Sequence, residues 1–303
     1  MSKNKGTSKM ELSILIPTYN DDCYNLVCDI QKQASAVSGL GYEIIVGDDG
    51  STHKSIVESI DRINSMERCR VIRPPKNIGR AAIRNLLARE ASYGWILYID
   101  ADMRISRQDF IKEYIEKATQ SCVVYGGYEI PNINLKGNLR YKYEKSVATN
   151  HSAEVRQENP YKDFHTSNFL IRRDVMLYTP FNEQIKRYGY EDVLFGKELK
   201  SKNICILHID NPVVFSTFES NEDFLRKTDE GITTLSEFES QLADYSRLIP
   251  ACKRLKNLHL QGITRFVFKM SEPILKRILV SGHAPLSLFS FYKVGRYITK
   301  KSK

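Results

Sequence analysis

Two acidic side chains, Asp100 and Asp102, stand one residue apart directly after a strongly apolar segment, Trp95–Ile99. In an extended segment, residues i and i+2 project to the same side, so the two carboxylates can face one site. Paired carboxylate oxygens suit a hard cation such as Mg²⁺ or Mn²⁺, and that cation can in turn bind a diphosphate. A solvated turn is the alternative, but the position at the end of an apolar segment favours a metal site.

Polar residues also follow two other apolar segments. Asp49 comes after residues 42–47, where its carboxylate can accept hydrogen bonds from N–H groups or ribose hydroxyls, and Gly50 permits a tight turn. Tyr19 comes after residues 12–16, and its ring could stack on a flat base. An ordinary Asp-Gly turn and a core tyrosine are the alternatives for these two positions.

Two charged pairs lie at the beginnings of predicted helices. Arg80 and Arg84 are four residues apart on one face, near a helix N-terminus that also favours phosphate. Solvated helix charges are the alternative. Glu191 and Asp192 begin another predicted helix, where acids offset the helix dipole. The functional alternative makes one of these acids a general base for a hydroxyl nucleophile.

The segments that must position these residues alternate between two patterns. Apolar, β-branched runs at 12–16 and 42–47 indicate buried strands, and helical spacing from 22 to 38 completes a first βαβ unit. Continued alternation predicts an α/β fold with a doubly wound, mixed and mostly parallel sheet flanked by helices. In such sheets the ligand site lies beyond the carboxyl ends of the strands, where the clusters fall. Further predicted elements are helices 54–66, 81–93 and 191–200 and strands 69–72, 95–99, 123–127, 169–172 and 204–209.

Seven clusters follow one another along the chain: Ile16-Pro-Thr-Tyr-Asn20, Asp48-Asp-Gly-Ser51, Asn77-x-Gly79 with Arg84-Asn85, Asp100-x-Asp102, Asn168 with Arg172-Arg173, Phe181-Asn-Glu183 and Gly189-x-Glu191-Asp192. This ordered set resembles a family 2 glycosyltransferase of the GT-A fold over residues 11 to 215. The resemblance implies inverting transfer of a hexosyl or N-acetylhexosaminyl group from a nucleotide-diphosphate donor, a UDP-sugar, to a hydroxyl of a glycan or lipid-linked acceptor. Inversion needs no enzyme nucleophile, and we find no Ser/His or Cys/His arrangement for one.

The resemblance also implies roles for the donor-side residues. Pro17, through its backbone, would hold the nucleoside together with Tyr19 and Asp49. Arg80 would lie near the base or the diphosphate, and Arg84 would bind the donor beside it.

Further roles concern the metal and the acceptor. Asp102 would coordinate Mn²⁺ or Mg²⁺ directly, and Asp100 would meet the ribose, or the metal through water. Asp192 matches the general base of the family, and Asn168 and Glu191 fall in the acceptor or sugar pocket.

One departure concerns the third metal ligand. Related enzymes frequently carry a histidine downstream of the Glu-Asp motif, and the corresponding position here is Phe215. His208 is the candidate substitute ligand, with a structural histidine as the alternative. The third protein ligand is thus left open.

The charge is unevenly distributed. The chain of 303 residues has 45 Lys and Arg against 36 Asp and Glu, a net charge of +9. Residues 250–303 hold twelve of the basic residues and one acid, Glu272, which leaves 33 basic against 35 acidic residues in positions 1–249. A near-neutral body argues against a nucleic-acid-binding protein. The excess of positive charge therefore lies in residues 250–303.

Apolar residues recur at helical spacing within 263–279, interleaved with basic ones, and a second such helix is expected after Pro285. Basic amphipathic helices bind anionic membrane surfaces, while packing on the catalytic domain is the alternative. Pro273 is expected to interrupt or kink the first helix.

We predict a basic N-terminal tail (1–10), a GT-A domain (11–219) and a helical, basic C-terminal extension (220–303).

The six cysteines form no CxxC pair, and we find neither a secretory leader nor an apolar run of about 20 residues. These features predict a cytoplasmic protein, with peripheral attachment to the inner face of the cell membrane as an option.

Two functions other than glycosyl transfer stay open. A nucleotidyltransferase would need a phosphate-cradling Gly-rich loop, which 17–20 is not, and an inactive glycosyltransferase relative would still bind nucleotide.

Overall fold

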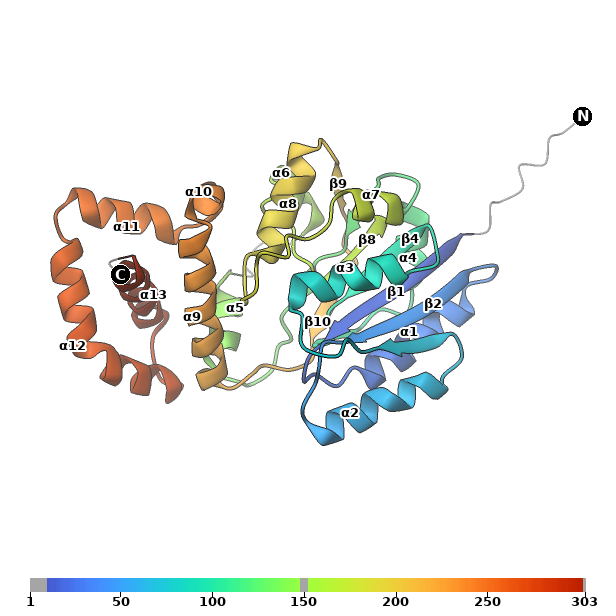
Figure 1. The fold of residues 1–303 in the computed structure, drawn as a ribbon, viewed down its shortest axis with the longest axis horizontal. Coiled ribbons are helices and arrows are strands. Elements are labelled where there is room, and N and C mark those ends of the chain that lie inside the picture. The colour runs from blue at the N-terminus through green and yellow to red at the C-terminus, as the bar shows by residue number, and fades with distance from the viewer. Residues whose placement is uncertain (1–9, 148–151, 302–303) are drawn as a thin grey trace, which may run out of the picture.

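The computed structural model describes residues 10–147 and 152–301, so the predicted tail 1–10 lies almost wholly outside the described residues. Within these ranges, seven strands form a sheet in the order β3-β2-β1-β4-β8-β6-β9 (Figure 1). β1 pairs in parallel with β2 and β4, whereas β8 runs antiparallel to both β4 and β6. The predicted mixed, mostly parallel sheet is confirmed. Its strands are β1 (Glu11–Thr18), β2 (Gly41–Asp48), β3 (Cys69–Ile72), β4 (Trp95–Ile99), β6 (Val123–Tyr125), β8 (Asn168–Arg172) and β9 (Ile206–His208).

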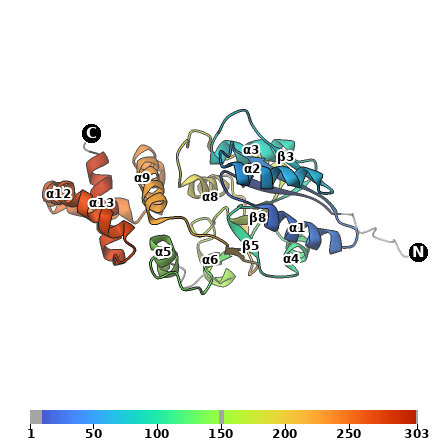
Figure 2. The same ribbon diagram turned by 90° about the horizontal axis from the view of Figure 1, so that it is seen from below.

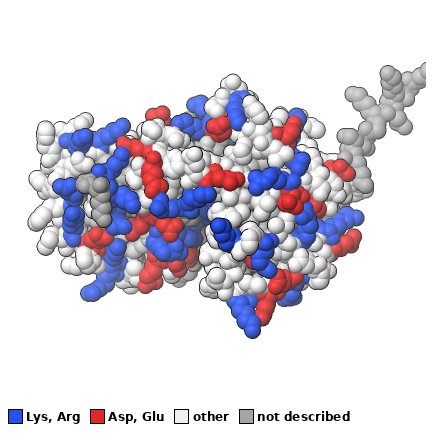
Figure 3. All heavy atoms as spheres, in the orientation of Figure 1, with Lys and Arg blue, Asp and Glu red and all other residues white. Residues whose placement is uncertain are grey.

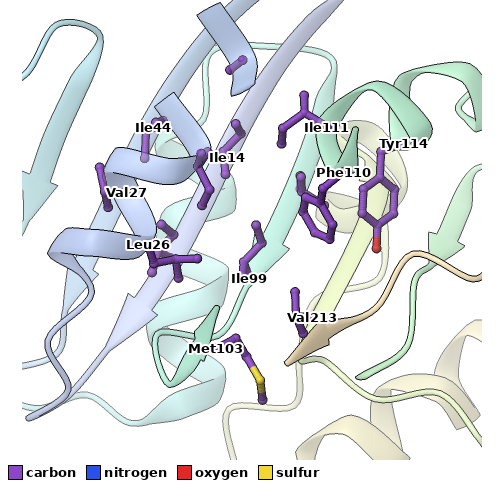
Figure 4. Packing of buried hydrophobic residues seen from close by; sticks show 14 of the residues in the cluster. Ile14, Leu26, Val27, Ile44, Ile99, Met103, Phe110, Ile111, Tyr114 and Val213 are labelled. Carbon is purple, nitrogen blue, oxygen red and sulfur yellow. The ribbon is translucent and has the colours of Figure 1, made fainter. Parts of the chain in front are cut away.

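Alternate side chains of the central strands enter two apolar layers, as the two-residue period of a strand requires. Ile14 and Ile44 pack with α1 and α4 in one layer (Figure 4), and Leu15 and Ile45 pack with α3 and α8 in the other. Both faces are therefore covered, which explains why the strands are apolar along their whole length. The helices around the sheet are α1 (Tyr24–Ala36), α2 (Lys54–Asp61), α3 (Arg80–Glu90), α4 (Phe110–Lys117), α6 (Ala153–Glu158), α7 (Arg173–Tyr178) and α8 (Glu191–Ser201).

A second, three-stranded sheet in the described chain has the order β5-β10-β7. β5 (Met103–Ile105) follows the Asp100-Ala-Asp102 motif, and β10 (Val213–Phe215) pairs with it antiparallel, while β7 (Tyr128–Glu129) completes the sheet. These strands are too short for hydrophobic periodicity to reveal them. They fix the segment after Asp102 against the C-terminal half of the domain.

The C-terminal region is helical, as predicted, and gathers at the end of the molecule opposite β1 and α1 (Figures 1 and 2). α9 stands between this region and the α/β part, and Ser220 caps it by accepting the N–H of Asp223 at 3.1 Å. None of the described helices has the length and apolarity needed to cross a bilayer. The helices of this region are α9 (Asn221–Glu237), α10 (Glu239–Leu242), α11 (Leu248–Asn257), α12 (Gln261–Val280) and α13 (Leu286–Lys300). α5 (Leu139–Val147), from the middle of the chain, lies against α9.

Two details concern the helices of the C-terminal region. α9 ends at Glu237, and the short α10 begins at Glu239. Pro273 lies inside α12, which continues through it to Val280. A proline removes one backbone donor, and packing of the buried face of α12 compensates for that loss.

Candidate active site

Hydrogen bonds between the ends of β1 and β2 fix the first loop of the site. Asn20 adopts a left-handed backbone conformation with φ 57°. Its side chain accepts the N–H of Thr52 at 2.8 Å, and its own N–H donates to the Ser51 hydroxyl at 2.8 Å. This turn leaves Tyr19 49% exposed, whereas Pro17 is buried within β1. The ring of Tyr19 is therefore accessible for stacking, and Pro17 can contribute only its backbone.

Asp49 is 3% exposed, and its carboxylate binds main-chain groups of the protein itself. Its carboxylate accepts the N–H groups of Ile78 at 2.7 Å and Gly79 at 2.9 Å. Burial raises the pKa of Asp49, and these two bonds oppose the rise. Gly50 has φ +84° and lies against the backbone of Asn77, which explains the glycine in this turn. Asp49 thus holds the loop before α3 against the end of β2.

Asp100 and the arginines of α3 form an ion-pair network that is buried at Arg84 and exposed at Arg80. Nη2 of Arg84 lies 2.5 Å from Oδ1 of Asp100, and Arg84 is 1% exposed. Arg80, one turn earlier, contacts Oδ2 of Asp100 at 3.8 Å and donates from Nε to Oε1 of Glu191 at 2.8 Å. Arg80 therefore connects the strand-end aspartate to the Glu-Asp pair on α8, which sequence places 91 residues later. The second oxygen of Glu191, Oε2, is buried without a hydrogen-bond partner among the described residues.

Asp102 differs from Asp100 because no ion pair or hydrogen bond engages its carboxylate in the described part of the chain. Its main-chain carbonyl accepts the N–H and the hydroxyl of Ser216, at 2.9 and 2.7 Å. Burial and the neighbouring Asp100 charge raise the pKa of Asp102 to about 6, against the opposing effect of Arg140. A bound cation would stabilise such a carboxylate. Asp102 therefore fits the predicted metal-ligand role by its own chemistry.

Asp192 pairs with a histidine that the sequence did not single out. Oδ2 of Asp192 lies 3.1 Å from Nδ1 of His165, and Oδ1 accepts the N–H of Val193 at 2.8 Å. Burial acts to raise the pKa of Asp192, but the His165 bond and charge and the Val193 N–H outweigh it, so the net shift is downward. Burial likewise acts to lower the pKa of His165, and Asp192 reverses this to a net rise. The arrangement keeps Asp192 ionised and oriented.

His165 escaped prediction because it lies in the loop between α6 and β8, outside any periodic segment. Its ring packs edge-on against Tyr128, with centroids 5.5 Å apart. Only its position three residues before the Asn168 motif could have indicated it. Arg140 was also missed, since it enters from α5 and binds Glu219 at 2.7 Å.

Asn168 is fully buried. Its side-chain carbonyl accepts the N–H of Gly126 at 3.1 Å and the Tyr114 hydroxyl, and its amide donates to the carbonyl of Gly127 at 2.8 Å. With its polar atoms used in this way, Asn168 supports the loop after β6 and does not itself line a pocket. We revise its expected role accordingly.

His208 is likewise engaged within the protein. Its Nε2 lies 2.9 Å from the carbonyl oxygen of Pro160, and its Nδ1 accepts from Nε of Arg156 at 3.3 Å. Burial lowers the pKa of His208 to about 4, which keeps the ring neutral. Because both ring nitrogens have protein partners, we remove His208 from the candidate metal ligands.

The position expected to hold a downstream histidine belongs to an aromatic cluster. Phe215 pairs with Met103 between β10 and β5 and stacks on Phe218, with centroids 5.5 Å apart. The Arg140 guanidinium lies 5.2 Å from the Phe215 ring. Within residues 10–147 and 152–301, no three His, Cys, Asp or Glu side chains are arranged to hold one metal ion. Among these described residues, Asp100 and Asp102 are thus not joined by a further His, Cys, Asp or Glu side chain into a three-residue metal cluster.

Comparison with known proteins identifies the family of the chain. Residues 13–177 match the family described as "Glycosyl transferase family 2". The chain belongs to this family. A Haemophilus influenzae protein described as an uncharacterized glycosyltransferase is 32% identical over 133 residues, which are 42% of this chain and 50% of that protein. The chain thus matches about half the length of this curated relative.

Solved structures share the fold at low sequence identity. TarS 1–349 of S. aureus superposes with a TM-score of 0.54 at 16% identity, covering 97% of this chain and 90% of TarS 1–349. The mannosyltransferase PcManGT of Pyrobaculum calidifontis, solved with GDP-Man and Mn²⁺, gives a TM-score of 0.57 at 14% identity, with coverage of 98% and 87%. The family 2 glycosyltransferase domain therefore has the predicted GT-A fold, and the C-terminal helices lie within the matched length.

Proposed function

We propose that this glycosyltransferase is an inverting enzyme that transfers a hexosyl or N-acetylhexosaminyl group from a UDP-sugar to a hydroxyl of a glycan or lipid-linked acceptor. The network from Asp100 through Arg80 to Glu191, with Asp192 adjacent, carries this proposal, because it links the donor-side motif to the candidate base. TarS has also been solved with UDP and with UDP-GlcNAc, and PcManGT with GDP-Man, which supports a nucleotide-sugar donor.

On the donor side, the Tyr19 ring stacks on the base, and the backbone of Pro17 borders the nucleoside. Asp49 shapes this pocket by holding the loop 77–79, which it binds through two N–H groups. Arg80 and Arg84 offer positive charge toward the diphosphate, since a helix N-terminus and guanidinium groups both favour phosphate.

The donor side also includes a divalent cation, Mn²⁺ or Mg²⁺, in the proposal. Asp102 would ligate it directly, and Asp100, already paired with Arg84, would meet it through water. When bound, such an ion offsets the charge that develops on the departing nucleoside diphosphate. The free carboxylate of Asp102 and its pKa of about 6 support this assignment.

On the acceptor side, Asp192 accepts the proton of the acceptor hydroxyl while that oxygen attacks the anomeric carbon from the face opposite the diphosphate. The bond from the anomeric carbon to the diphosphate oxygen breaks, and the electron pair leaves with the nucleoside diphosphate. His165 is the positioning residue, because its hydrogen bond at 3.1 Å fixes the orientation of the Asp192 carboxylate. Glu191 faces the sugar pocket through its unpartnered Oε2.

The proposal places the enzyme in the cytoplasm, in polysaccharide biosynthesis, with attachment to the inner face of the membrane. All six cysteines are free thiols, in keeping with a reducing compartment. An inactive, nucleotide-binding relative is the competing function, because the described residues include no three-residue metal cluster. The experiments below separate the two.

A thermal-shift screen of nucleotide sugars with and without Mn²⁺ tests donor binding. A ligand that binds only the folded state raises Tm in proportion to its affinity and concentration. We expect the largest rise with a UDP-sugar plus Mn²⁺, and expect Asp102→Ala to lose the part that depends on Mn²⁺. An equal rise in Asp102→Ala would refute the metal assignment.

Substitution of the base tests catalysis separately from binding. Asp192→Asn should keep the donor-induced rise in Tm but lower the transfer rate by about 10²–10⁴-fold, the usual contribution of a general base. Transfer at the wild-type rate would remove Asp192 as the base. Donor binding by the wild type without transfer to any of a panel of glycan and lipid-linked acceptors would favour the inactive relative.

A further inference from the structure

The outward side of α12 carries a row of apolar side chains that stand exposed. Phe266 and Met270 are 66% and 68% exposed, and Ile263 and Ile274 are 63% and 62% exposed. Large apolar side chains in such numbers are unusual on one surface helix of a soluble domain and indicate an interaction site. We call this set the α12 row: Ile263, Phe266, Val267, Met270, Ile274 and Ile278.

The α12 row forms one face of the helix. Its members recur at spacings of three and four residues, which places them along a single side. From 263 to 278 the row extends about 22 Å, at about 1.5 Å per residue. The opposite side, with Phe268, Leu275 and Leu279, is buried against α13 and α9 and holds α12 in place. The side chains of the α12 row therefore do not contribute to holding α12 in the fold.

The charge around the α12 row is of one sign. Lys269 and Arg277 are exposed on α12, and Lys253, Arg254 and Lys256 are exposed on the preceding α11. None of the five forms an ion pair with the described residues. At the end of the molecule where α12 lies, Figure 3 shows uncharged surface together with Lys and Arg side chains.

Glu272, the single acid of residues 250–303, is paired with basic side chains and does not face this surface. Glu272 binds Arg296 at 3.1 Å and Lys276 at 3.1 Å. Its charge is thereby compensated inside the helical region. The outward face consequently presents apolar side chains and positive charge without a competing negative charge.

We infer that this face of α12 docks on an anionic lipid bilayer. A helix with an apolar face and basic flanks lies in the plane of the interface, with the apolar side chains inserted and the cations near lipid phosphates. The location of α12 at the end of the molecule, away from the α/β part, allows it to lie flat on a surface (Figure 1). A second copy of the chain fits less well, since two such faces would bring like charges together. The inference stands independently of the proposed transferase activity.

Vesicle co-sedimentation of the full chain tests this docking. Vesicles of phosphatidylcholine alone are compared with vesicles containing about one third phosphatidylglycerol, at low and high salt. The wild type should bind the anionic vesicles, and bind less as salt screens the charges. The apolar variant Phe266→Ser/Met270→Gln/Ile274→Asn and the charge variant Lys269→Glu/Arg277→Glu should each lower the partition coefficient about tenfold or more.

Matched variants on the α/β part serve as controls. Leu177→Gln/Tyr178→Ser removes exposed apolar side chains, and Lys32→Glu/Lys200→Glu makes the same charge change elsewhere; both should bind vesicles as the wild type does. Wild-type binding by the apolar variant, or no binding by the wild type, would overturn the inference. So would a wild-type dimer in light scattering that the apolar variant converts to a monomer while its vesicle binding is unchanged.

Discussion

At the scale of single residues, the site depends on pairs whose members come from distant parts of the chain. Asp192 belongs to a Glu-Asp motif at the start of α8, whereas its partner His165 lies in a loop before β8. Residue type and motif order propose Asp102 as a metal ligand and Asp192 as the base, and both assignments stay predictions. Residue type and motif order could not distinguish a side chain that faces ligand from one that supports a loop, as Asp49 and Asn168 do, because burial depends on long-range packing.

The first prediction concerns His165→Gln. His165 holds the pKa of Asp192 below its ordinary value, and burial alone would raise it. Without the imidazolium, the proposed base Asp192 should become protonated at a higher pH. We expect the acid limb of the kcat/KM profile against pH to move upward, with a several-fold loss of transfer in mild acid and a smaller loss at alkaline pH. A pH-independent loss would indicate a purely structural role.

The stability of the same pair provides the control for this prediction. The pKa of His165 is raised on folding, so its contribution is complete below about 6.5 and is lost as pH rises through the folded value. The pKa of Asp192 is lowered, so its contribution is complete above about 3.9 and is lost as pH falls through the folded value. A double-mutant cycle in urea should show the largest coupling between these limits and little coupling at pH 9. Equal coupling at pH 5 and pH 9 would contradict an ion pair.

At the scale of elements, the sequence was most informative where strands are apolar throughout and helices are long. Buried parallel strands and 3.6-residue periodicity predicted β1 to β4, α8 and α12 closely. The small sheet escaped, because β5, β7 and β10 have three residues or fewer and depend on pairing between distant segments. The small sheet places Phe215 of β10 beside Met103, the residue after Asp102. Phe215 is the position at which the resemblance to related enzymes leads us to expect a histidine.

Packing between the two terminal helices gives a second prediction. A Cβ added at Gly295 in α13 would lie 2.1 Å from the ring of Phe268 in α12, so the two helices can approach closely only with glycine there. Gly295→Ala should lower the free energy of unfolding by about 1–3 kcal/mol or more, measured in urea. Gly262→Ala in α12 is the control, because an added Cβ there meets nothing within 4 Å. Its stability should be unchanged or up to about 1 kcal/mol higher, from helix propensity. Equal effects of the two substitutions would contradict the close contact.

At the scale of the whole molecule, the predicted boundary at residue 220 separates segments that nevertheless share a core. Leu194 on α8 packs in one apolar cluster with Leu235 on α9 and with Ile298 on α13. The uneven charge of the sequence suggested a separable basic tail. In the structure, the buried face of the tail packs with Leu194 in an apolar cluster that is separate from the two layers on the sheet. Truncation would therefore expose apolar surface on α8 and would not isolate a function.

This shared core predicts cooperative unfolding, which one tryptophan can report. Trp95, the sole tryptophan, lies in β4 of the catalytic sheet, while far-UV circular dichroism is dominated by the helices. Both signals should change in one transition, because two units joined by a buried apolar cluster unfold together. Ile298→Ala, at a fully buried position on α13, should lower stability by about 2–5 kcal/mol in both signals equally. A Trp95 transition that Ile298→Ala leaves in place would mean that the catalytic domain folds without its C-terminal helices, and the extension would then be an independent unit attached to a complete enzyme.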